Sequence, residues 1–181
     1  DAIKTVTEAW NNYKAEKHKV VKFVPASGAA SRMFKNLFAF LDASYETPTT
    51  DFEKFFFYNL KRFAFYDELN KKCKTTHGKD IEELLAANNY KIVVETLLHT
   101  DGLNYGQLPK GLLLFHKYAE GARTAMEEHL VEGAQYAACN NEVCVHFTVS
   151  HEHLELFKAK ATEKQPIYEE KYHTHFSISF S

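Results

Sequence analysis

The sequence has 181 residues, of which 45% are hydrophobic and 25% are charged, as expected for one ordinary globular domain with a sizeable core. Its formal net charge of −2 argues against a general binder of nucleic acid or membrane surfaces, and no apolar run is long enough to span a bilayer. Three cysteines, an odd and low number, fit a reducing compartment better than a disulfide framework, so we expect a cytoplasmic protein.

The first predicted elements are a helix, a strand and a second helix. Apolar residues at helical spacing predict the first helix over 3–17. A buried strand follows over 20–25 and is closed by Pro25, which suits the end of a strand and not its middle. A run of small residues over 26–31 then leads into a helix over 30–42.

This strand, small-residue turn and helix predict a phosphate-binding site. In such a turn, backbone N–H groups point at the ligand and the positive end of the helix dipole lies behind them. Small side chains let a phosphate approach the backbone, and Arg32 in the first helical turn can act as a forked phosphate donor. The alternative is that the small residues only let the helix pack on the sheet, with Arg32 solvated.

The stretch over 43–105 is predicted to be a helical insert in an α/β framework. Thr50 and Glu53 fit a capping box, and the aromatic residues that follow predict one helix over 51–72. Because these rings exceed what a helix with one wet face needs, we expect this helix to be covered on two sides, as core or as a packing surface for missing parts and not as a ligand pocket. A polar turn over 71–79 and two short helices, over 80–88 and 90–99, complete the insert.

Strands and helices alternate in the rest of the chain. A loop over 102–111 leads to a short apolar strand over 112–115, a helix over 121–138 and a strand over 143–149. Ser150 is expected to cap a helix that runs to about Ala161, and a loop at Pro166 to precede a last strand over 173–180. This order predicts a mostly parallel sheet with helices on both faces, in which ligands bind at the carboxyl ends of the strands.

Two motifs resemble those of the nucleotide-sugar pyrophosphorylases, the sugar-1-phosphate nucleotidyltransferases. Their signature A-G-G-x-G-[ST]-R-[LM] is matched in type by Ala26, Gly28, Ser31, Arg32 and Met33, and glycines of the signature are replaced at Ser27 and Ala30. If those positions need a positive φ, Ser and Ala would be strained there. A downstream Pro-Lys followed by an apolar strand resembles Pro109–Lys110 and the residues after them.

The whole chain also resembles a bacterial family, domain of unknown function 4301. The resemblance is carried by three stretches, 23–33, 102–111 and 145–150. Together the resemblances imply a Rossmann-like, nucleotide-diphospho-sugar transferase-like α/β domain over 1–181, with the helical insert at 43–105. That family is longer than this chain and the chain stops inside a predicted strand, so we expect a fragment of a longer protein.

The resemblance implies a nucleoside triphosphate and a sugar phosphate as ligands, with Mg²⁺ as cofactor. The turn of Ala26, Ser27, Gly28, Ala29, Ala30 and Ser31 would cradle the nucleotide. Arg32 would contact the β- and γ-phosphates, and Lys110 the α-phosphate or the sugar phosphate. A binding module without turnover, or an interaction domain that uses the aromatic insert, stays open as an alternative.

The histidines do not complete a metal site by spacing. His151 and His153 are two residues apart and do not share a helix face, whereas His173 and His175 alternate on one face of the predicted strand and could pair. No Cys or carboxylate spacing completes a recognised zinc motif. These residues and His146 are therefore expected to be ordinary core or surface histidines.

Overall fold

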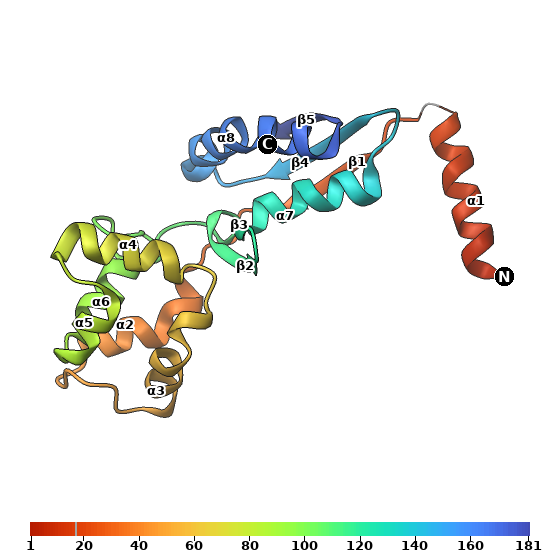
Figure 1. Cartoon of the computed structure of the whole chain (residues 1–181). Helices are drawn as coiled ribbons and strands as arrows, with labels where there is room; N and C mark the ends of the chain where they lie inside the picture. The colour runs from red at the N-terminus through yellow and green to blue at the C-terminus, as the bar shows by residue number, and fades with distance from the viewer. Residues whose placement is uncertain (17) are drawn as a thin grey trace. The chain divides into compact units, whose positions relative to one another are not determined.

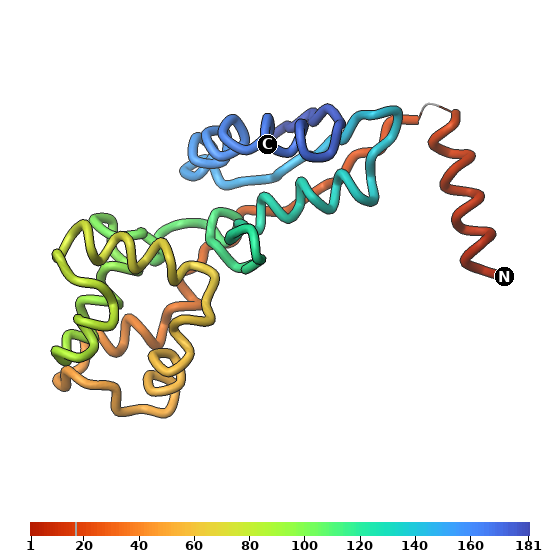
Figure 2. The backbone as a smooth tube through the Cα atoms, viewed as in Figure 1, coloured from red at the N-terminus to blue at the C-terminus, as the bar shows by residue number. Residues whose placement is uncertain are grey.

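The computed structural model contains both helices and strands and describes residues 1–16 and 18–181. Its contacts divide the chain into two units, traced in Figures 1 and 2. The sheet unit comprises Asp1–Ser27 and Met126–Ser181, and the helical unit comprises Gly28–Ala125. The predicted insert over 43–105 lies wholly inside the helical unit. A single domain over 1–181 stays a prediction.

The sheet unit contains a three-stranded parallel sheet in the order β1-β4-β5. The strands are β1 (Val21–Pro25), β4 (Glu142–Thr148) and β5 (His175–Phe180), with Val21 opposite Cys144 and Val143 opposite Phe176. Helix α8 (Leu154–Tyr172) connects β4 to β5, because parallel neighbours need a crossover. The predicted parallel sheet is thus confirmed for three strands, whereas its Rossmann-like identity stays a prediction.

Two helices pack on the same face of this sheet. Helix α7 (Ala125–Glu132), which a π-helical turn (Gly133–Ala137) extends, contributes His129, and α8 contributes Phe157. Both rings contact the ring of Phe147, which is fully buried on β4. On the opposite face, Phe23 stacks on His146 at 5.4 Å between ring centroids and is 62% exposed. Helices on both faces of the sheet therefore stay a prediction.

Helix α1 (Ala2–Ala15) confirms the first predicted helix, although its predicted end at residue 17 lies outside the described residues. None of the residues of α1 is buried. Its apolar side chains Ile3 and Val6 are largely exposed. Hydrophobic spacing therefore predicted the helix correctly without predicting what it packs against.

The helical unit holds a large apolar core. It begins with a 3-10 turn (Ser31–Phe34) and contains α2 (Lys35–Asp42), α3 (Asp51–Tyr58), a 3-10 turn (Leu60–Arg62), α4 (Tyr66–His77), α5 (Ile81–Ala86) and α6 (Tyr90–Leu98). The two short helices predicted over 80–88 and 90–99 are confirmed as α5 and α6. Phe40, Leu69 and Leu97 lie at the centre of this core, with no exposed surface.

The predicted single helix over 51–72 and the turn over 71–79 are wrong. Asn59 ends α3 and its side-chain Nδ2 donates to Phe55 O at 2.9 Å, and Phe63 is extended with ψ 144°. Helix α4 then runs through the expected turn to His77 and ends at Gly78, whose φ is 69°. The left-handed conformation of Gly78 satisfies carbonyls at the helix end, so the glycine marks the end of α4 and not a longer loop.

The strand predicted over 112–115 and the helix predicted from 121 also need correction. A 3-10 turn (Lys110–Leu112) is followed by β2 (Leu114–Tyr118), which pairs antiparallel with β3 (Gly121–Thr124) in a separate two-stranded sheet. Gly121 has φ 135° and lies opposite Tyr118. Glycine adopts such a φ readily. Because the hairpin extends to Thr124, α7 begins only at Ala125.

The loop predicted at Pro166 is wrong as well, because Pro166 lies inside α8. A proline inside a helix removes one hydrogen bond and usually disrupts it. Here Phe157, Ala161 and Tyr168 are buried along α8, and Gln165 Nε2 donates to Phe176 O at 2.8 Å on β5. Tertiary packing therefore keeps the helix continuous across the proline.

Candidate functional site

The two motif segments that the sequence singled out lie side by side in the helical unit. Lys110 N donates to Gly28 O at 3.0 Å, and Ala30 N donates to Leu108 O at 3.4 Å. Between them, Ala29 and Pro109 form an isolated antiparallel bridge. We call the segments 28–32 and 108–110 the paired loops. The structure thus brings together two stretches that were linked in the sequence only by resemblance.

The backbone of the small-residue run is partly committed to the protein itself. Ala26 N donates to Thr148 O at 2.8 Å, and Ala30 N to Leu108 O. These two N–H groups are therefore not free for a ligand in this conformation. The α-helix begins at Lys35, and the 3-10 turn from Ser31 to Phe34 separates it from the small residues. The helix start predicted at residue 30 is thus shifted along the chain.

The residues that replace signature glycines are not strained. Ala30 has φ −85° and ψ −13°, an ordinary right-handed conformation, and Ser27 has no positive φ. The backbone of Gly28 also has a negative or extended φ. A Cβ added to Gly28 would meet only Lys110 Cδ, at 3.9 Å. Neither strain nor crowding therefore requires a glycine at position 28.

The paired loops carry two exposed cations. Arg32 and Lys110 are both exposed, as is Ser31. Within residues 1–16 and 18–181, neither cation forms an ion pair with a carboxylate. Ala30 and Leu108 are joined by a backbone hydrogen bond. Arg32 follows Ala30 by two residues, and Lys110 follows Leu108 by two residues. The Cα of each cation is therefore at most about 7 Å from the Cα of the hydrogen-bonded residue in its own segment. The loops therefore present positive charge beside a short stretch of fixed backbone.

Close packing, which is absent at Gly28, explains Gly102 and Gly106 of the second motif. A Cβ on Gly102 would lie 1.9 Å from Thr96 O, and one on Gly106 would lie 2.7 Å from Phe38 Cζ. Both glycines therefore let the loop after α6 pack closely against neighbouring atoms. The motif over 102–111 thus combines a packing role at its start with an exposed lysine at its end.

The acidic and histidine side chains of the described residues do not cluster in threes. It contains no group of three or more His, Cys, Asp or Glu side chains that could hold a metal ion. His146 hydrogen-bonds Ser179 and Ser181 at 2.8 and 2.9 Å, and His175 Nδ1 lies 2.9 Å from Glu169 Oε1. The Mg²⁺ expected from the resemblance stays a prediction, and no step below depends on it.

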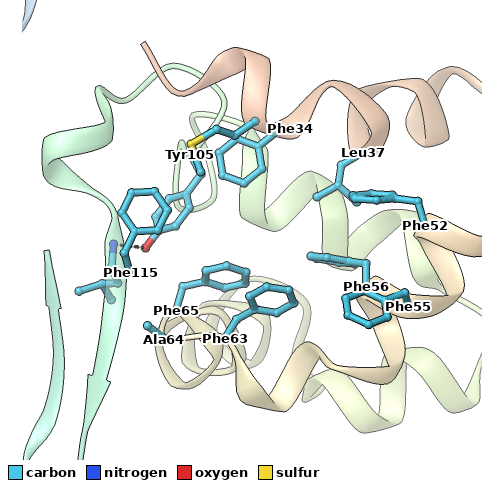
Figure 3. A pocket seen from close by; sticks show the side chains of 12 residues that line it. Phe34, Leu37, Phe52, Phe55, Phe56, Phe63, Ala64, Phe65, Tyr105 and Phe115 are labelled. Atoms are coloured by element: carbon cyan, nitrogen blue, oxygen red, sulfur yellow. Dashed lines mark hydrogen bonds between the residues drawn. The ribbon is translucent and has the colours of Figure 1, made fainter. Parts of the chain in front are cut away.

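Sequence reasoning missed an apolar pocket in the helical unit. The pocket has a volume of about 430 Å³, and Figure 3 shows the side chains that surround it. They come from the start of the unit, from α3, from the segment before α4, from the loop after α6 and from β2. The lining residues, which we call the aromatic pocket, are Met33, Phe34, Leu37, Phe52, Phe55, Phe56, Phe63, Ala64, Phe65, Tyr105, Leu114 and Phe115.

The one polar side-chain group in this lining is the Tyr105 hydroxyl. It accepts a hydrogen bond from Leu114 N at 3.2 Å, and burial raises the pKa of Tyr105 to about 12. The hydroxyl therefore stays neutral and holds the start of β2. A usable sequence signal was the density of phenylalanines over 52–65, which a single helix cannot direct to one side.

The whole chain was compared with known proteins and protein families. None of the described helices combines the length and apolar character needed to cross a membrane. Comparison with the curated proteins found no matching relative, and comparison with the solved structures found no matching fold. A family model matches residues 1–181, the full length given. The chain therefore belongs to the family described as domain of unknown function (DUF4301).

Proposed function

We propose that the paired loops bind the phosphates of a nucleoside triphosphate. The observation that carries the proposal is the hydrogen-bonded pairing of Gly28 with Lys110, which sets an exposed lysine beside the exposed turn that bears Arg32. Arg32 and Lys110 have no carboxylate partner among the described residues, so both are available to neutralise phosphate oxygens. Gly28 has no Cβ, and the space that a Cβ would fill is bordered only by Lys110 Cδ. A phosphate can therefore approach the backbone of Gly28 closely.

The reaction we propose for this site is the transfer of a nucleotidyl group to a sugar phosphate. A sugar-phosphate oxygen attacks the α-phosphorus, the bond from that phosphorus to the bridging oxygen breaks, and pyrophosphate leaves. Such a transfer needs positioning and charge neutralisation and no protein nucleophile. In this chain Arg32 would neutralise the leaving β- and γ-phosphates, and Lys110 would neutralise the α-phosphate. The reaction itself is supported by the resemblance and not by the loops alone.

A binding module without turnover is the second candidate. Two observations favour it. The N–H groups of Ala26 and Ala30 already donate to carbonyls of the protein, and the described residues contain no group of three or more His, Cys, Asp or Glu side chains that could hold a metal ion. A module of this kind needs only the affinity of the paired loops for phosphates. The two candidates therefore share one binding step and differ in whether pyrophosphate is released.

Thermal unfolding of the full chain tests the binding step. Each nucleoside triphosphate is added with and without Mg²⁺, and a ligand at one hundred times its Kd should stabilise the chain by about 2.7 kcal/mol. We expect this shift to disappear in Arg32→Ala and in Lys110→Ala. Lys54→Ala is the matched control, because Lys54 is an exposed lysine on α3 outside the paired loops.

The outcomes separate the candidates. A shift that Arg32→Ala retains in full, or no shift with any nucleotide, would refute phosphate binding at the paired loops. If the shift is present and lost in both loop variants, pyrophosphate release is measured with a panel of sugar 1-phosphates. Release that depends on Lys110 supports the transfer, whereas binding without release supports the module.

A further inference from the structure

The aromatic pocket has a chemistry that the paired loops do not use. Its volume of about 430 Å³ falls within the range of about 300–1,000 Å³ that is usual for small-molecule sites. Its walls are almost wholly hydrocarbon, and none of the described residues that line it is charged. We infer that this pocket is a binding site for an uncharged small molecule that contains an aromatic ring.

The pocket is lined by buried as well as exposed rings. Phe34, Phe56, Phe65 and Tyr105 of its lining are buried, whereas Phe55 is 64% exposed. Figure 3 shows these side chains and those of Phe63 and Phe115 arranged around one open space. A protein partner would instead need a broad surface of about 800 Å² on each side. A pocket of this volume fits a small molecule better.

The lining disfavours strongly polar ligands. The Tyr105 hydroxyl accepts the N–H of Leu114, so among the described lining side chains its own O–H is the one polar donor left to a ligand. A sugar or phosphate moved from water into such walls would lose hydrogen bonds without replacement. The ligand inferred here is therefore chemically distinct from the nucleotide proposed for the paired loops.

The rings of the walls favour an aromatic ligand. Phe63 and Phe65 stack at 5.1 Å with an angle of 8° between their planes, and Phe56 tilts against Phe63 at 5.4 Å and 34°. Ring pairs at such separations attract one another through their quadrupoles. A flat ring inserted among them can therefore make offset-stacked or edge contacts that a saturated chain cannot make.

A buried carboxylate fixes the wall that α3 contributes. Glu53 is only 3% exposed and accepts hydrogen bonds from Thr49 N at 2.7 Å, Thr50 N at 3.0 Å and the Tyr45 hydroxyl at 2.9 Å. These bonds hold the first turn of α3, which carries Phe52, Phe55 and Phe56 into the lining. The wall is therefore set before a ligand arrives, and less free energy is lost in ordering it.

Fluorescence of N-phenyl-1-naphthylamine, an uncharged aromatic probe, tests the site on the full chain. We expect saturable binding with one probe molecule per chain. Phe55→Ala removes a lining ring that is already 64% exposed and should weaken binding about two- to tenfold, as expected for one aromatic contact. Tyr58→Ala is the matched control, since Tyr58 is an aromatic residue on the same helix, is 89% exposed and does not line the pocket.

A second variant narrows the pocket without removing a wall. Ala64 lines the pocket, and Ala64→Met fills space there with a flexible side chain. Circular dichroism confirms that each variant is folded. Weaker binding in Phe55→Ala and Ala64→Met, with Tyr58→Ala unchanged, supports the inference.

Three results would overturn the inference. One is binding that does not saturate, and a second is equal weakening by Phe55→Ala and Tyr58→Ala. The third is a chain that sediments as a dimer, loses the dimer in Phe55→Ala and fails to bind the probe, which would show that a second copy covers the pocket. Nucleotide stabilisation is measured in parallel and should not change in Ala64→Met, so failure of this site and failure of the paired loops are distinguishable.

Discussion

Alanine substitutions at two glycines of the shared motifs should differ strongly in their effect on stability. At Gly102, the added Cβ would lie 1.9 Å from Thr96 O and 2.6 Å from Thr96 C. The loop or helix α6 must therefore move. This movement weakens the hydrogen bonds from Leu103 N to Thr96 O at 2.8 Å and from Gly102 N to His99 O at 3.0 Å.

The size of the effect follows from these contacts. Overpacking of a well-packed region costs about 1–3 kcal/mol, and a weakened backbone hydrogen bond about 1 kcal/mol. We therefore expect Gly102→Ala to lower the free energy of unfolding by about 3 kcal/mol. At Gly28, where a Cβ would meet only Lys110 Cδ at 3.9 Å, the change should lie within about 0.5 kcal/mol.

Urea denaturation followed by circular dichroism measures both changes. With an m-value of about 1–3 kcal/mol/M, Gly102→Ala should lower the midpoint clearly, and Gly28→Ala should leave it almost unchanged. A stable Gly102→Ala would refute the close approach of the loop to α6. A large loss in Gly28→Ala would refute the open geometry of the paired loops, and with it the reason for a glycine that serves ligand binding.

Three further changes test other parts of the structure. Burial alone would raise the pKa of Glu53, but its hydrogen bonds to backbone N–H groups and Tyr45 lower that pKa below the ordinary 4.5. Glu53→Gln should therefore lower the free energy of unfolding by about 2–3 kcal/mol at neutral pH in urea titrations. The difference between wild type and variant should shrink below pH 4.5, and a difference that does not change with pH would show a purely steric effect. Because burial raises the pKa of Tyr105 from 10.0 to about 12, the wild type should lose about 2 kcal/mol more than Tyr105→Phe between pH 9 and pH 12, and parallel pH profiles would contradict this. Gly133→Ala places a Cβ 2.7 Å from Val143 Cγ1 and should destabilise the chain by about 1–3 kcal/mol; a double-mutant cycle with Val143→Ala should recover part of that loss, and strict additivity would argue against the contact.

Local patterns predicted the elements that local chemistry determines. The strand that ends at Pro25, the capping box of Thr50 and Glu53, and the helices over 81–86 and 90–98 are all present. In each case the signal lies within a few residues. The strand was predicted to be buried, but only Val24 of β1 is buried. The capping box was also the first sign of the wall of the aromatic pocket, although its buried carboxylate could not be foreseen from spacing alone.

Features that depend on distant packing were not predictable in the same way. Pro166 continues a helix because buried residues on α8 hold it against the sheet, whereas an isolated proline predicts a break. The apolar run before Phe115 suits a buried strand equally well in a parallel sheet or a hairpin. The glycine at 121 is the local cue for the hairpin, and its value is clear only with its φ of 135°.

The candidate site was predictable in part. Resemblance selected the segments around Gly28 and Lys110, and the structure places them in contact. Their distance could not be obtained from the sequence, because a long stretch of helices separates them. The aromatic pocket needed five segments to converge, and no motif spacing records such convergence.

The division of the chain also affects the order in which it can fold during synthesis. Strand β1 leaves the ribosome early, yet its partner β4 follows only after the whole helical unit, with Val21 opposite Cys144. The helical unit is continuous in sequence and can fold while β1 is still unpaired. Once Gly28 and Lys110 are joined, the chain path that must close to pair β1 with β4 is much shorter, which lowers the entropy cost of that closure. The contact between Gly28 and Lys110, which is proposed to hold phosphates, would thus also speed the pairing of β1 with β4 during folding.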